Sequence, residues 1–392
     1  MVASEVVDAL RATSCGRSLL GVAQGKDGLW LVGGAVRDLL LGLTPLELDI
    51  AVEGAVAPIA DALGGDVTLH DRFETATVIS GACRFDLART RTEVYAAPGA
   101  LPDVTPASLD ADLARRDITI NAIAVHLPDG LVKAVPGAIE DLRAGVVRVL
   151  HDASFSDDPT RVWRVARYAA RLRFAVDEHT LVLARAAGRG AVSGERLGHE
   201  LRLALAEDDP CAVFERVTEL NPMALAAGFT PRPGQLPAAL DLLPSDGRRD
   251  LVTLAACCAA IDLDLLQRWL DHLQFTARDR DTVVAASRWV TGAPLRSASG
   301  PAEIARAARG APVEAVALAG GENARRWLAE LRHIRLEIDG ADLLAAGLEQ
   351  GPEVGARLGA VLDAKLAGHV AGREQELAMA LGAYGPGPRS AD

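Results

Sequence analysis

Cysteine is scarce in this chain of 392 residues, and its pattern supports neither a disulfide framework nor a zinc site. The five cysteines form no C-x-x-C pair and no Cys/His spacing that suits zinc. We therefore predict reduced, mostly buried thiols at these positions. They are Cys15, Cys83, Cys211, Cys257 and Cys258.

Long apolar runs are also missing. No stretch reaches the roughly 18 apolar residues that a membrane-spanning helix needs. The N-terminus, MVASEVVDALRATSC, is acidic and amphipathic, and it lacks the basic start and apolar core of a secretory signal. We therefore expect a soluble, cytoplasmic protein with no membrane partner.

Lysine is nearly absent, because only Lys26, Lys133 and Lys365 occur among the 41 basic residues. The net charge of −12 argues against a nucleic-acid partner if only the sum is considered. Between Arg115 and Arg173, however, ten basic residues stand against seven acidic ones, which gives a local net charge of +3. A positive belt on an acidic body is therefore compatible with RNA binding.

Hydrophobic patterning predicts an α+β protein with a small mixed-sheet head and a helical remainder. Strand-like and helix-like runs alternate up to about residue 150, and Ala/Leu/Arg-rich helical periodicity follows from Phe155. We predict a small mixed sheet with helices in residues 1–150, a helical neck in 151–230, a helical body and tail in 231–384, and a disordered end in 385–392. The predicted strands of the head are 29–33, 47–52, 66–70, 75–80 and 83–88, and its helices are 5–12, 35–41 and 56–63.

Residues 29–52 have the layout of a site for metal ions and a triphosphate. An apolar strand ends in Gly33-Gly34, where the absent side chains let backbone N–H groups approach an anion at a helix N-terminus. A second strand then presents Glu47 and Asp49 on one face, because alternate strand residues share a face. Two carboxylates at this spacing can share a pair of Mg²⁺ ions.

A third carboxylate is expected from a neighbouring strand, because two-metal phosphoryl transfer needs an ion at the attacking hydroxyl and another at the triphosphate. Asp86 in CRFDLARTR is the best placed, and Glu93 in RTEVY is the rival. Ordinary solvated charges are the alternative for both. Arg37, in the helix after the glycines, is close enough in sequence to reach a phosphate.

RRDITINAIA mixes charge with an alternating apolar run, which is unusual for a plain helix or loop. A charged helix edge is the simplest interpretation. The functional alternative is that Arg116 and Asp117, which follow Arg115, contact a ribose and triphosphate beside the metal site.

DDPTR opens a helix, with Asp157 as its cap and Pro159 in its first turn. Asp158 and Arg161 are three residues apart, so an ion pair on one side of the helix is the simplest interpretation. The sharper hypothesis is base recognition. A carboxylate accepts from an exocyclic amino group while a guanidinium donates to a ring nitrogen, an order that cytosine and adenine share and that uracil and guanine invert. A solvated stripe or an RNA phosphate track would continue through Arg164, Arg167 and Arg171.

Together these segments resemble the class II tRNA nucleotidyltransferase and bacterial poly(A) polymerase family, a branch of the DNA polymerase β-like nucleotidyltransferases. LVGGAVRDLLLG with ELDIAVEG resembles its catalytic motif, RRDITINAIA its ribose-contacting motif, and DDPTRVWRVARYAARLRF its base-selecting motif. DGADLLAAGLEQGPEVGARL, residues 339–358, is similar to a C-terminal segment of many bacterial members. Only about 210–330 lacks a motif-by-motif match.

The resemblance implies roles for individual residues. Glu47 and Asp49 would bind two Mg²⁺ ions and, with Asp86, form the catalytic set. The family usually has Asp-x-Asp at the position of Glu47 and Asp49. Glutamate can also ligate Mg²⁺, so activity with an altered metal geometry is expected here. The nucleotide would contact Gly33, Gly34, Arg37, Arg116, Asp117, Asn121, Asp158 and Arg161, with Arg164 and Arg167 beside them.

The resemblance further implies an enzyme that adds C and A to tRNA 3′ ends from CTP and ATP without a template. Its partners would be the tRNA acceptor end and these nucleotides, and its oligomeric state is left open. Members that add only A, only C residues or a poly(A) tail are alternatives, and HDRFETATV and LHDASFSDDPTR look close to A-adding members. A catalytically silent RNA-binding relative is the alternative of another class, suggested by Glu47 and the net acidity.

Overall fold

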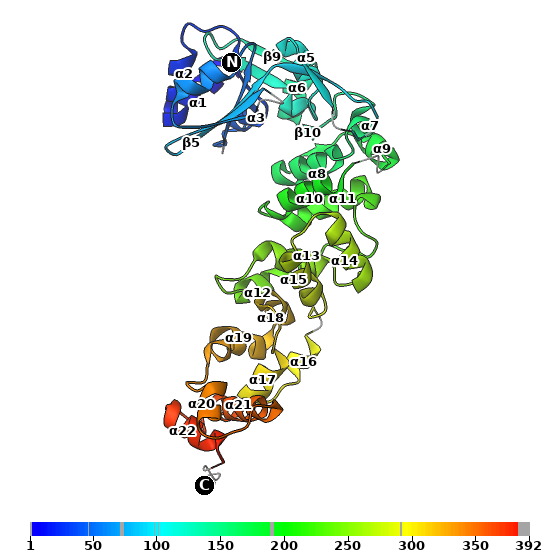
Figure 1. Cartoon of the computed structure of the whole chain (residues 1–392). Coiled ribbons are helices and arrows are strands. Elements are labelled where there is room, and N and C mark those ends of the chain that lie inside the picture. Colours follow the sequence, from blue (N-terminus) through cyan, green and yellow to red (C-terminus); the bar gives the residue numbers. More distant parts are fainter. Residues whose placement is uncertain are drawn as a thin grey trace. The chain divides into compact units, whose positions relative to one another are not determined.

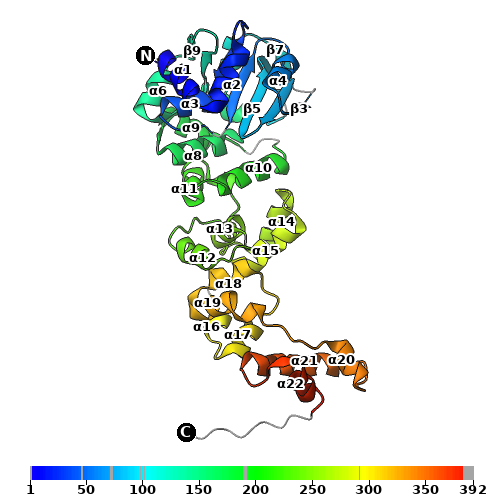
Figure 2. The ribbon, with the colours of Figure 1, turned by 90° about the vertical axis from the view of Figure 1, so that its left-hand side faces the viewer.

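The computed structural model describes residues 2–45, 47–70, 74–97, 99–100, 102–188, 192–290 and 292–382. Two compact units make up the chain, Met1–Leu225 and Ala226–Asp392 (Figures 1 and 2). The first unit holds the predicted head together with most of the predicted neck. Within the described residues, no helix is long and apolar enough to cross a membrane. The predicted disordered end, 385–392, lies outside the described residues.

The first unit begins with an α+β region, which confirms the predicted fold class. Its helices are α1 (Val2–Ala12), α2 (Ser14–Ala23), α3 (Gly33–Leu40), α4 (Ala57–Leu63), α5 (Leu109–Ala114), η2 (Thr119–Asn121) and α6 (Ala138–Ala144). Its strands are β1 (Leu29–Val32), β2 (Leu48–Val52), β3 (Asp66–His70), β4 (Thr75–Ser80), β5 (Cys83–Arg89), β6 (Arg91–Val94), β7 (Asp103–Pro106), β8 (Ile123–His126) and β9 (Val132–Ala134).

Among the described residues, one seven-stranded mixed sheet has the order β3-β4-β5-β2-β1-β8-β9. Strands β2 and β5 run parallel, and the other neighbours in this sheet are antiparallel. In the β2–β5 register, Asp49 stands opposite Asp86. The pairing therefore brings together two acidic residues that are far apart in the sequence.

Strand β1 is buried along its whole length. Trp30 and Val32 pack in one cluster with Leu109 and Leu113 of α5. Leu31 projects to the opposite face because strand side chains alternate, and it is buried as well. A strand buried on both faces explains why the sequence LWLV is apolar throughout rather than alternating.

The remainder of the first unit is mainly helical. Its elements are β10 (Val146–Val147), α7 (Ser154–Asp157), α8 (Arg161–Leu172), β11 (Ala175–Val176), α9 (Glu178–Ala186), α10 (Gly194–Leu205), α11 (Pro210–Leu220) and η3 (Pro222–Ala224). Helix α8 buries Val162, Val165 and Ala169 on its apolar side. That burial holds its arginine-bearing side toward the cavity described below.

The prediction that Asp157 caps the helix of the DDPTR segment was wrong. Asp157 is the last residue of α7, and α8 begins only at Arg161. Asp158 between them is extended, with φ −139° and ψ 95°. The cause is Pro159, because the residue before a proline is driven out of the helical region by a clash with the proline ring.

The cysteine prediction was wrong for two of the five residues. Cys15 of α2 and Cys83 of β5 form a disulfide, with Cα atoms 5.4 Å apart. Their separation of 68 residues leaves no local spacing pattern, so the pairing arises only when α2 lies beside β5 (Figure 2). Cys211, Cys257 and Cys258 are buried thiols, as predicted.

The second unit contains helices but no strand within its described residues. They are α12 (Leu236–Leu242), α13 (Arg249–Cys257), α14 (Leu263–His272), α15 (Ala277–Ser287), α16 (Ala293–Arg296), α17 (Pro301–Ala307), α18 (Val313–Ala319), α19 (Gly321–Ala329), η4 (Leu331–His333), α20 (Gly340–Ala345), α21 (Pro352–Leu366) and α22 (Gly372–Ala380). The segment 339–358 opens with a capping box, in which the Asp339 carboxylate accepts from the backbone N–H of Asp342 and the Asp342 carboxylate accepts in return.

Candidate active site

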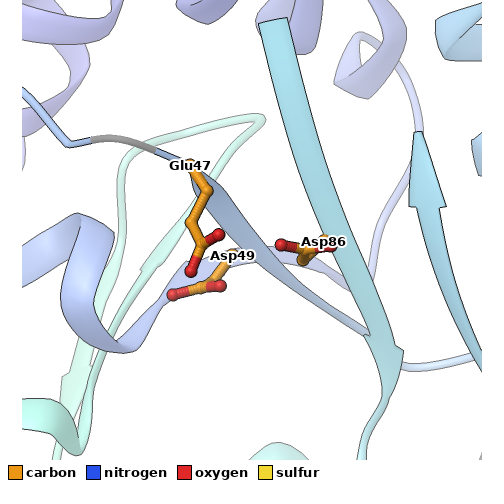
Figure 3. A group of neighbouring side chains, drawn as sticks. All are labelled: Glu47, Asp49 and Asp86. Atoms are coloured by element: carbon orange, nitrogen blue, oxygen red, sulfur yellow. The ribbon is translucent and has the colours of Figure 1, made fainter. Parts of the chain in front are cut away.

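Three carboxylates come together where β2 pairs with β5. Glu47 directly precedes β2, Asp49 lies within it, and Asp86 is opposite Asp49 on β5. Each residue offers one oxygen, and the three oxygens lie within 4.8 Å of one another (Figure 3). The structure therefore brings Asp86 to the predicted pair.

Like charges at this distance make proton loss unfavourable. Burial and the neighbouring Glu47 raise the pKa of Asp49 to about 7. Burial and the neighbouring Asp86 raise the pKa of Glu47. Three oxygen ligands with a shortage of positive charge suit a hard divalent cation such as Mg²⁺, whose charge would favour their ionised forms.

Two side chains hold Asp86. Thr77 Oγ1 on β4 donates to Asp86 Oδ1 at 2.6 Å. Arg84 Nε lies 2.9 Å from Asp86 Oδ2 and 3.3 Å from Glu47 Oε2. The Arg84 side chain is 52% exposed, so it compensates the cluster only in part.

Glu93, the rival third carboxylate, is held in a different network. Arg115 Nη1 lies 2.7 Å from Glu93 Oε1, and the Tyr95 hydroxyl donates to Glu93 Oε2 at 2.9 Å. Burial and the negative charge of Glu93 raise the pKa of Tyr95 to about 12. Glu93 thus lines the wall of the site with its charge matched by arginine.

The Gly33-Gly34 pair at the start of α3 permits a close approach to the cluster. Gly33 has φ +67°, in the left-handed region that favours glycine. A Cβ atom on Gly33 would lie 2.8 Å from Arg116 Nη1, and one on Gly34 would lie 3.8 Å from Asp49 Oδ2. Larger residues would therefore crowd the space between the start of α3 and the carboxylates.

Arg37 is 1% exposed, and its guanidinium is already engaged. Nη1 donates to Asn121 Oδ1, while Nε and Nη2 donate to Asp38 Oδ1. The guanidinium carbon also lies 4.7 Å from the centroid of the Tyr168 ring. Arg37 lines the cavity as a fixed positive charge, which suits an anionic ligand.

Asp117 is a buried carboxylate that is fully matched by donors. It accepts from Arg164 Nε at 2.8 Å, from Asn121 Nδ2 at 3.2 Å and from the backbone N–H of Ile118 at 2.9 Å. Burial alone would raise its pKa, but Arg164 and the Asn121 hydrogen bond outweigh burial and lower it. Asp117 in turn raises the pKa of Arg164.

Arg116 is positioned by Asp112, a residue that sequence reasoning missed. Arg116 Nη2 donates to Asp112 Oδ2 at 3.0 Å, and Arg115 Nη2 donates to Asp112 Oδ1 at 2.7 Å. Burial opposes ionisation of Asp112, but the two arginines outweigh it and lower its pKa. The signal was available, because Asp112 lies three and four residues before the two arginines on a helical segment.

Asp158 pairs with Arg196 of α10 rather than forming the simple pair with Arg161. Arg196 Nη2 lies 2.8 Å from Asp158 Oδ2, and Thr160 donates its backbone N–H and its hydroxyl to Asp158 Oδ1. The Ser193 hydroxyl caps the N-terminus of α10 by accepting from the Arg196 backbone N–H, which fixes the position of the Arg196 backbone. A carboxylate has about four lone-pair sites, so these three contacts leave room for one more donor.

Arg161 has one buried donor without a partner. Nη2 donates to the Arg115 carbonyl at 2.9 Å. Nη1 is buried and has no hydrogen-bond partner among the described residues. A buried unsatisfied guanidinium N–H is costly, so this atom is a natural donor for a bound ligand.

Arg167 and Arg171 are compensated by carboxylates of the neck. Arg167 contacts Glu200 at 3.3 Å and Glu207 at 3.1 Å, and Arg171 contacts Glu207 at 2.6 Å. These pairs tie α8 to α10 and the segment after it. A continuous arginine track for RNA phosphates stays a prediction.

One cavity of about 1290 Å³ brings most of these groups together. Its lining includes every predicted site residue except Asp86, which reaches it through the carboxylate cluster. Sequence reasoning missed Tyr168 and Arg196, which lie in this lining. The predicted residues in the lining are Gly33, Gly34, Arg37, Glu47, Asp49, Arg116, Asp117, Asn121, Asp158, Arg161, Arg164 and Arg167, with the rival Glu93.

Known proteins share this head in sequence. Residues 29–148 match the family model of the poly A polymerase head domain. An A-adding tRNA nucleotidyltransferase of Halalkalibacterium halodurans is 39% identical over 217 residues, covering 52% of this chain and 51% of that relative. A CC-adding tRNA nucleotidyltransferase of Deinococcus radiodurans is 43% identical over 190 residues, covering 46% and 51%. The chain thus spans about half the length of these curated relatives.

The likeness to solved structures extends over nearly the whole chain. The CCA-adding enzyme of Thermotoga maritima, solved in complex with tRNA, is 25% identical with a TM-score of 0.72, and the match covers 97% of this chain and 98% of that one. Other CCA-adding enzymes with this fold were solved with CTP or with ATP. Residues 29–148 are therefore similar to the poly A polymerase head domain, and the two relatives named above are tRNA nucleotidyltransferases.

Proposed function

We propose that the protein is a Mg²⁺-dependent tRNA nucleotidyltransferase of the cytoplasm, which adds C and A to tRNA 3′ ends from CTP and ATP without a template. The observation that carries this proposal is one cavity that joins the carboxylate cluster to an arginine-rich wall. At about 1290 Å³ it exceeds the range of roughly 300–1,000 Å³ usual for a single small ligand. It has room for a nucleotide and for the end of a second substrate.

In this reaction the tRNA 3′ oxygen forms a bond to the α-phosphorus, and the bond from the α-phosphorus to the bridging oxygen breaks as pyrophosphate leaves. Two Mg²⁺ ions held by Glu47, Asp49 and Asp86 would stabilise the attacking and leaving oxygens. Arg37 and Arg116, which lie beside the Gly-Gly turn, would neutralise the triphosphate. Asp117 would keep Asn121 and Arg164 in place for the sugar and phosphates.

Base selection would fall to Asp158 and Arg161. Arg161 Nη1 is an unsatisfied donor, and a ring nitrogen of cytosine or adenine can accept a hydrogen bond from it. The remaining lone pair of Asp158 can accept from the exocyclic amino group that both bases carry. Uracil and guanine present the opposite order of donors and acceptors at this edge, so they would leave both groups unpaired.

Three tRNA substrates test this proposal, with ends before C74, after C75 and after A76. Each is incubated with the full chain, Mg²⁺ and one labelled nucleotide at a time. We expect C on the first, A on the second and nothing on the third. Addition of A alone, to the C75-ended tRNA alone, would overturn full CCA addition. Asp49→Asn is the control that separates incorporation by this chain from a contaminating activity.

A narrower activity is the second candidate, because the relatives named above include both an A-adding and a CC-adding enzyme. The same three substrates distinguish these activities by the product each one yields, and long A tracts would indicate poly(A) synthesis. Retained tRNA binding without incorporation in Mg²⁺ or Mn²⁺ would instead identify a catalytically silent RNA-binding protein.

A further inference from the structure

Cys15 and Cys83 join helix α2 to strand β5, the strand that carries Asp86. We propose that this pair is a redox modification site, which is reversibly crosslinked and thereby anchors the start of β5 behind the metal-binding face. Its basis is the thiol chemistry and the carboxylate cluster of the first unit. It does not require the activity proposed above.

The two cysteines differ from the other three in accessibility. Cys15 and Cys83 are partly exposed, so that small reagents can reach them. Cys211, Cys257 and Cys258 are buried, at 2%, 0% and 0% exposure. Burial also raises the pKa of the Cys258 thiol, which lowers its reactivity further. The chain therefore holds one reactive pair together with three internal controls.

Crosslinking proceeds by thiol–disulfide exchange with a low-molecular-weight disulfide such as oxidised glutathione. One cysteine thiolate attacks the glutathione disulfide and releases one glutathione thiol. The second cysteine then attacks the mixed disulfide, closes the Cys15–Cys83 bond and releases the other glutathione. Two protein thiols are oxidised as one disulfide is reduced to two thiols, and excess dithiol reverses both steps.

Strand geometry connects the crosslink to the carboxylates. Side chains alternate along β5, so Cys83 shares a face with the buried Phe85, while Arg84 and Asp86 project to the other face. Arg84 contacts Glu47 and Asp86 on that face. The crosslink thus holds the strand from behind at the residue next to Arg84.

The first two residues of β5 have fewer strand neighbours than the middle of β5. Its pairing with β4 begins at Cys83, but its pairing with β2 begins only at Phe85. Residues 83 and 84 therefore have one strand neighbour within the described sheet. The bond to α2 supplies the second attachment, and its loss would let the end of the β4–β5 hairpin move, which would displace Asp86 relative to Glu47 and Asp49.

The crosslink also closes a long loop. The 68-residue separation encloses the Gly-Gly turn, Glu47 and Asp49, and Asp86 follows just after it. Closing a loop of this length restricts the unfolded chain, which raises the melting temperature of the first unit by roughly 9–18 °C on the usual scaling. Anchoring of Asp86 beside Glu47 and Asp49 is expected to strengthen divalent metal binding by roughly three- to tenfold, because the three ligands are then held in one arrangement.

The first experiment counts reactive thiols in the folded full chain. The protein is equilibrated with oxidised glutathione or with excess dithiothreitol, freed of reagent, alkylated, and digested for mass spectrometry. We expect alkylation of Cys15 and Cys83 only after reduction, and of the three buried cysteines only after unfolding. Alkylation of Cys15 and Cys83 after the oxidising treatment would overturn the proposal.

The second experiment compares the two redox states by thermal unfolding and by Mn²⁺ titration followed by electron paramagnetic resonance. The oxidised protein should melt higher and bind Mn²⁺ more tightly, and the variant Cys15→Ser/Cys83→Ser should match the reduced protein in both reagents. Equal melting temperatures and Mn²⁺ affinities in the two states would contradict an anchoring role. Neither readout uses tRNA, so failure of the proposed transferase activity leaves this test intact.

Discussion

Two groups of carboxylates in one cavity differ in how their charge is matched. In the first, Glu47, Asp49 and Asp86 stand together, and burial with the neighbouring Glu47 raises the pKa of Asp49 to about 7. In the second, Asp117 is more deeply buried, yet Arg164 and Asn121 outweigh burial and lower its pKa. Both residues line the same cavity, so burial alone does not decide their charge.

The difference lies in how the protein supplies opposite charge. Asp117 has a guanidinium, a side-chain amide and a backbone N–H within hydrogen-bond distance. Asp49 has two acidic neighbours, and the charges of Arg116 and Arg37 near it do not outweigh burial and Glu47. Arg84 reaches only the other two members of the cluster. A carboxylate whose charge is compensated by protein donors has a structural role. A cluster of carboxylates without such compensation marks the place where a bound ligand has to supply positive charge.

The largest expected effect comes from Asp49→Asn. Removal of this ligand weakens cation binding, and the lost stabilisation of the transition state, several kcal/mol, corresponds to a drop of roughly 1,000-fold or more in nucleotide incorporation. Stability should not fall, because the change removes one of three like charges. Steady-state incorporation and urea unfolding measure the two effects. A clear loss of stability in metal-free buffer would show that Asp49 has a structural role after all.

Asp117→Asn should give the reverse result for stability. The change leaves Arg164 facing a neutral amide, and breaking a buried pair costs about 3–5 kcal/mol, reduced here to roughly 1–3 kcal/mol because the Arg164 side chain is 34% exposed. Urea unfolding of this variant beside Asp49→Asn measures the contrast directly. Equal stabilities for the two variants would show that Asp117 and Asp49 do not differ in their contribution to stability.

Acid titration sharpens the same contrast. The pKa of Asp117 is lowered in the folded protein, so its stabilising contribution is complete above the unfolded carboxyl value of about 3.9 and is lost as pH falls through the lower folded value. Wild-type stability should therefore fall more steeply below about pH 4 than that of Asp117→Asn. Chemical unfolding at a series of pH values measures this, and parallel curves would contradict it.

The sequence was sufficient for features that depend on local pattern. The LWLV strand, the Gly-Gly turn and the strand carrying Asp49 follow from apolar runs, glycine and alternation, and all lie where they were predicted. Asp86 was the preferred third carboxylate because it lies in a strand-like run, and the parallel β2–β5 register brings it to Asp49. The helical remainder of the chain followed from periodicity.

Features that depend on distant contacts were not predictable in this way. Arg196 meets Asp158 only because α10 packs beside the start of α8, and Cys15 meets Cys83 only because α2 lies beside β5. The cap at Asp157 failed because a proline two residues later ended the short helix first. Tertiary packing, rather than local propensity, set these positions.

A change at Tyr168 should have a moderate effect, and it tests how Arg37 and Arg164 are held in the cavity. Its ring centroid lies 4.7 Å from the guanidinium carbon of Arg37 and 5.7 Å from that of Arg164. Cation–π contacts contribute about 0.5–2 kcal/mol each, so Tyr168→Leu should raise the KM for nucleotides by roughly three- to tenfold with little change in kcat. Tyr168→Phe keeps the ring and is the matched control. If Tyr168→Phe raises the KM as much as Tyr168→Leu does, the hydroxyl rather than the ring face is the functional group.

Glu47→Asp should have the smallest effect, and it tests the carboxylate cluster at its most exposed member. Glu47 precedes β2 and its side chain is 45% exposed, so the cluster tolerates movement there better than at Asp49. Shortening the side chain withdraws the oxygens by about 1.5 Å but keeps the charge, and we expect incorporation within roughly threefold of wild type, with a changed preference between Mg²⁺ and Mn²⁺. Glu47→Gln keeps the length and removes the charge, so it should be the poorer enzyme in both metals. A larger loss in Glu47→Asp than in Glu47→Gln would mean that reach, rather than charge, is what this residue contributes to the cluster.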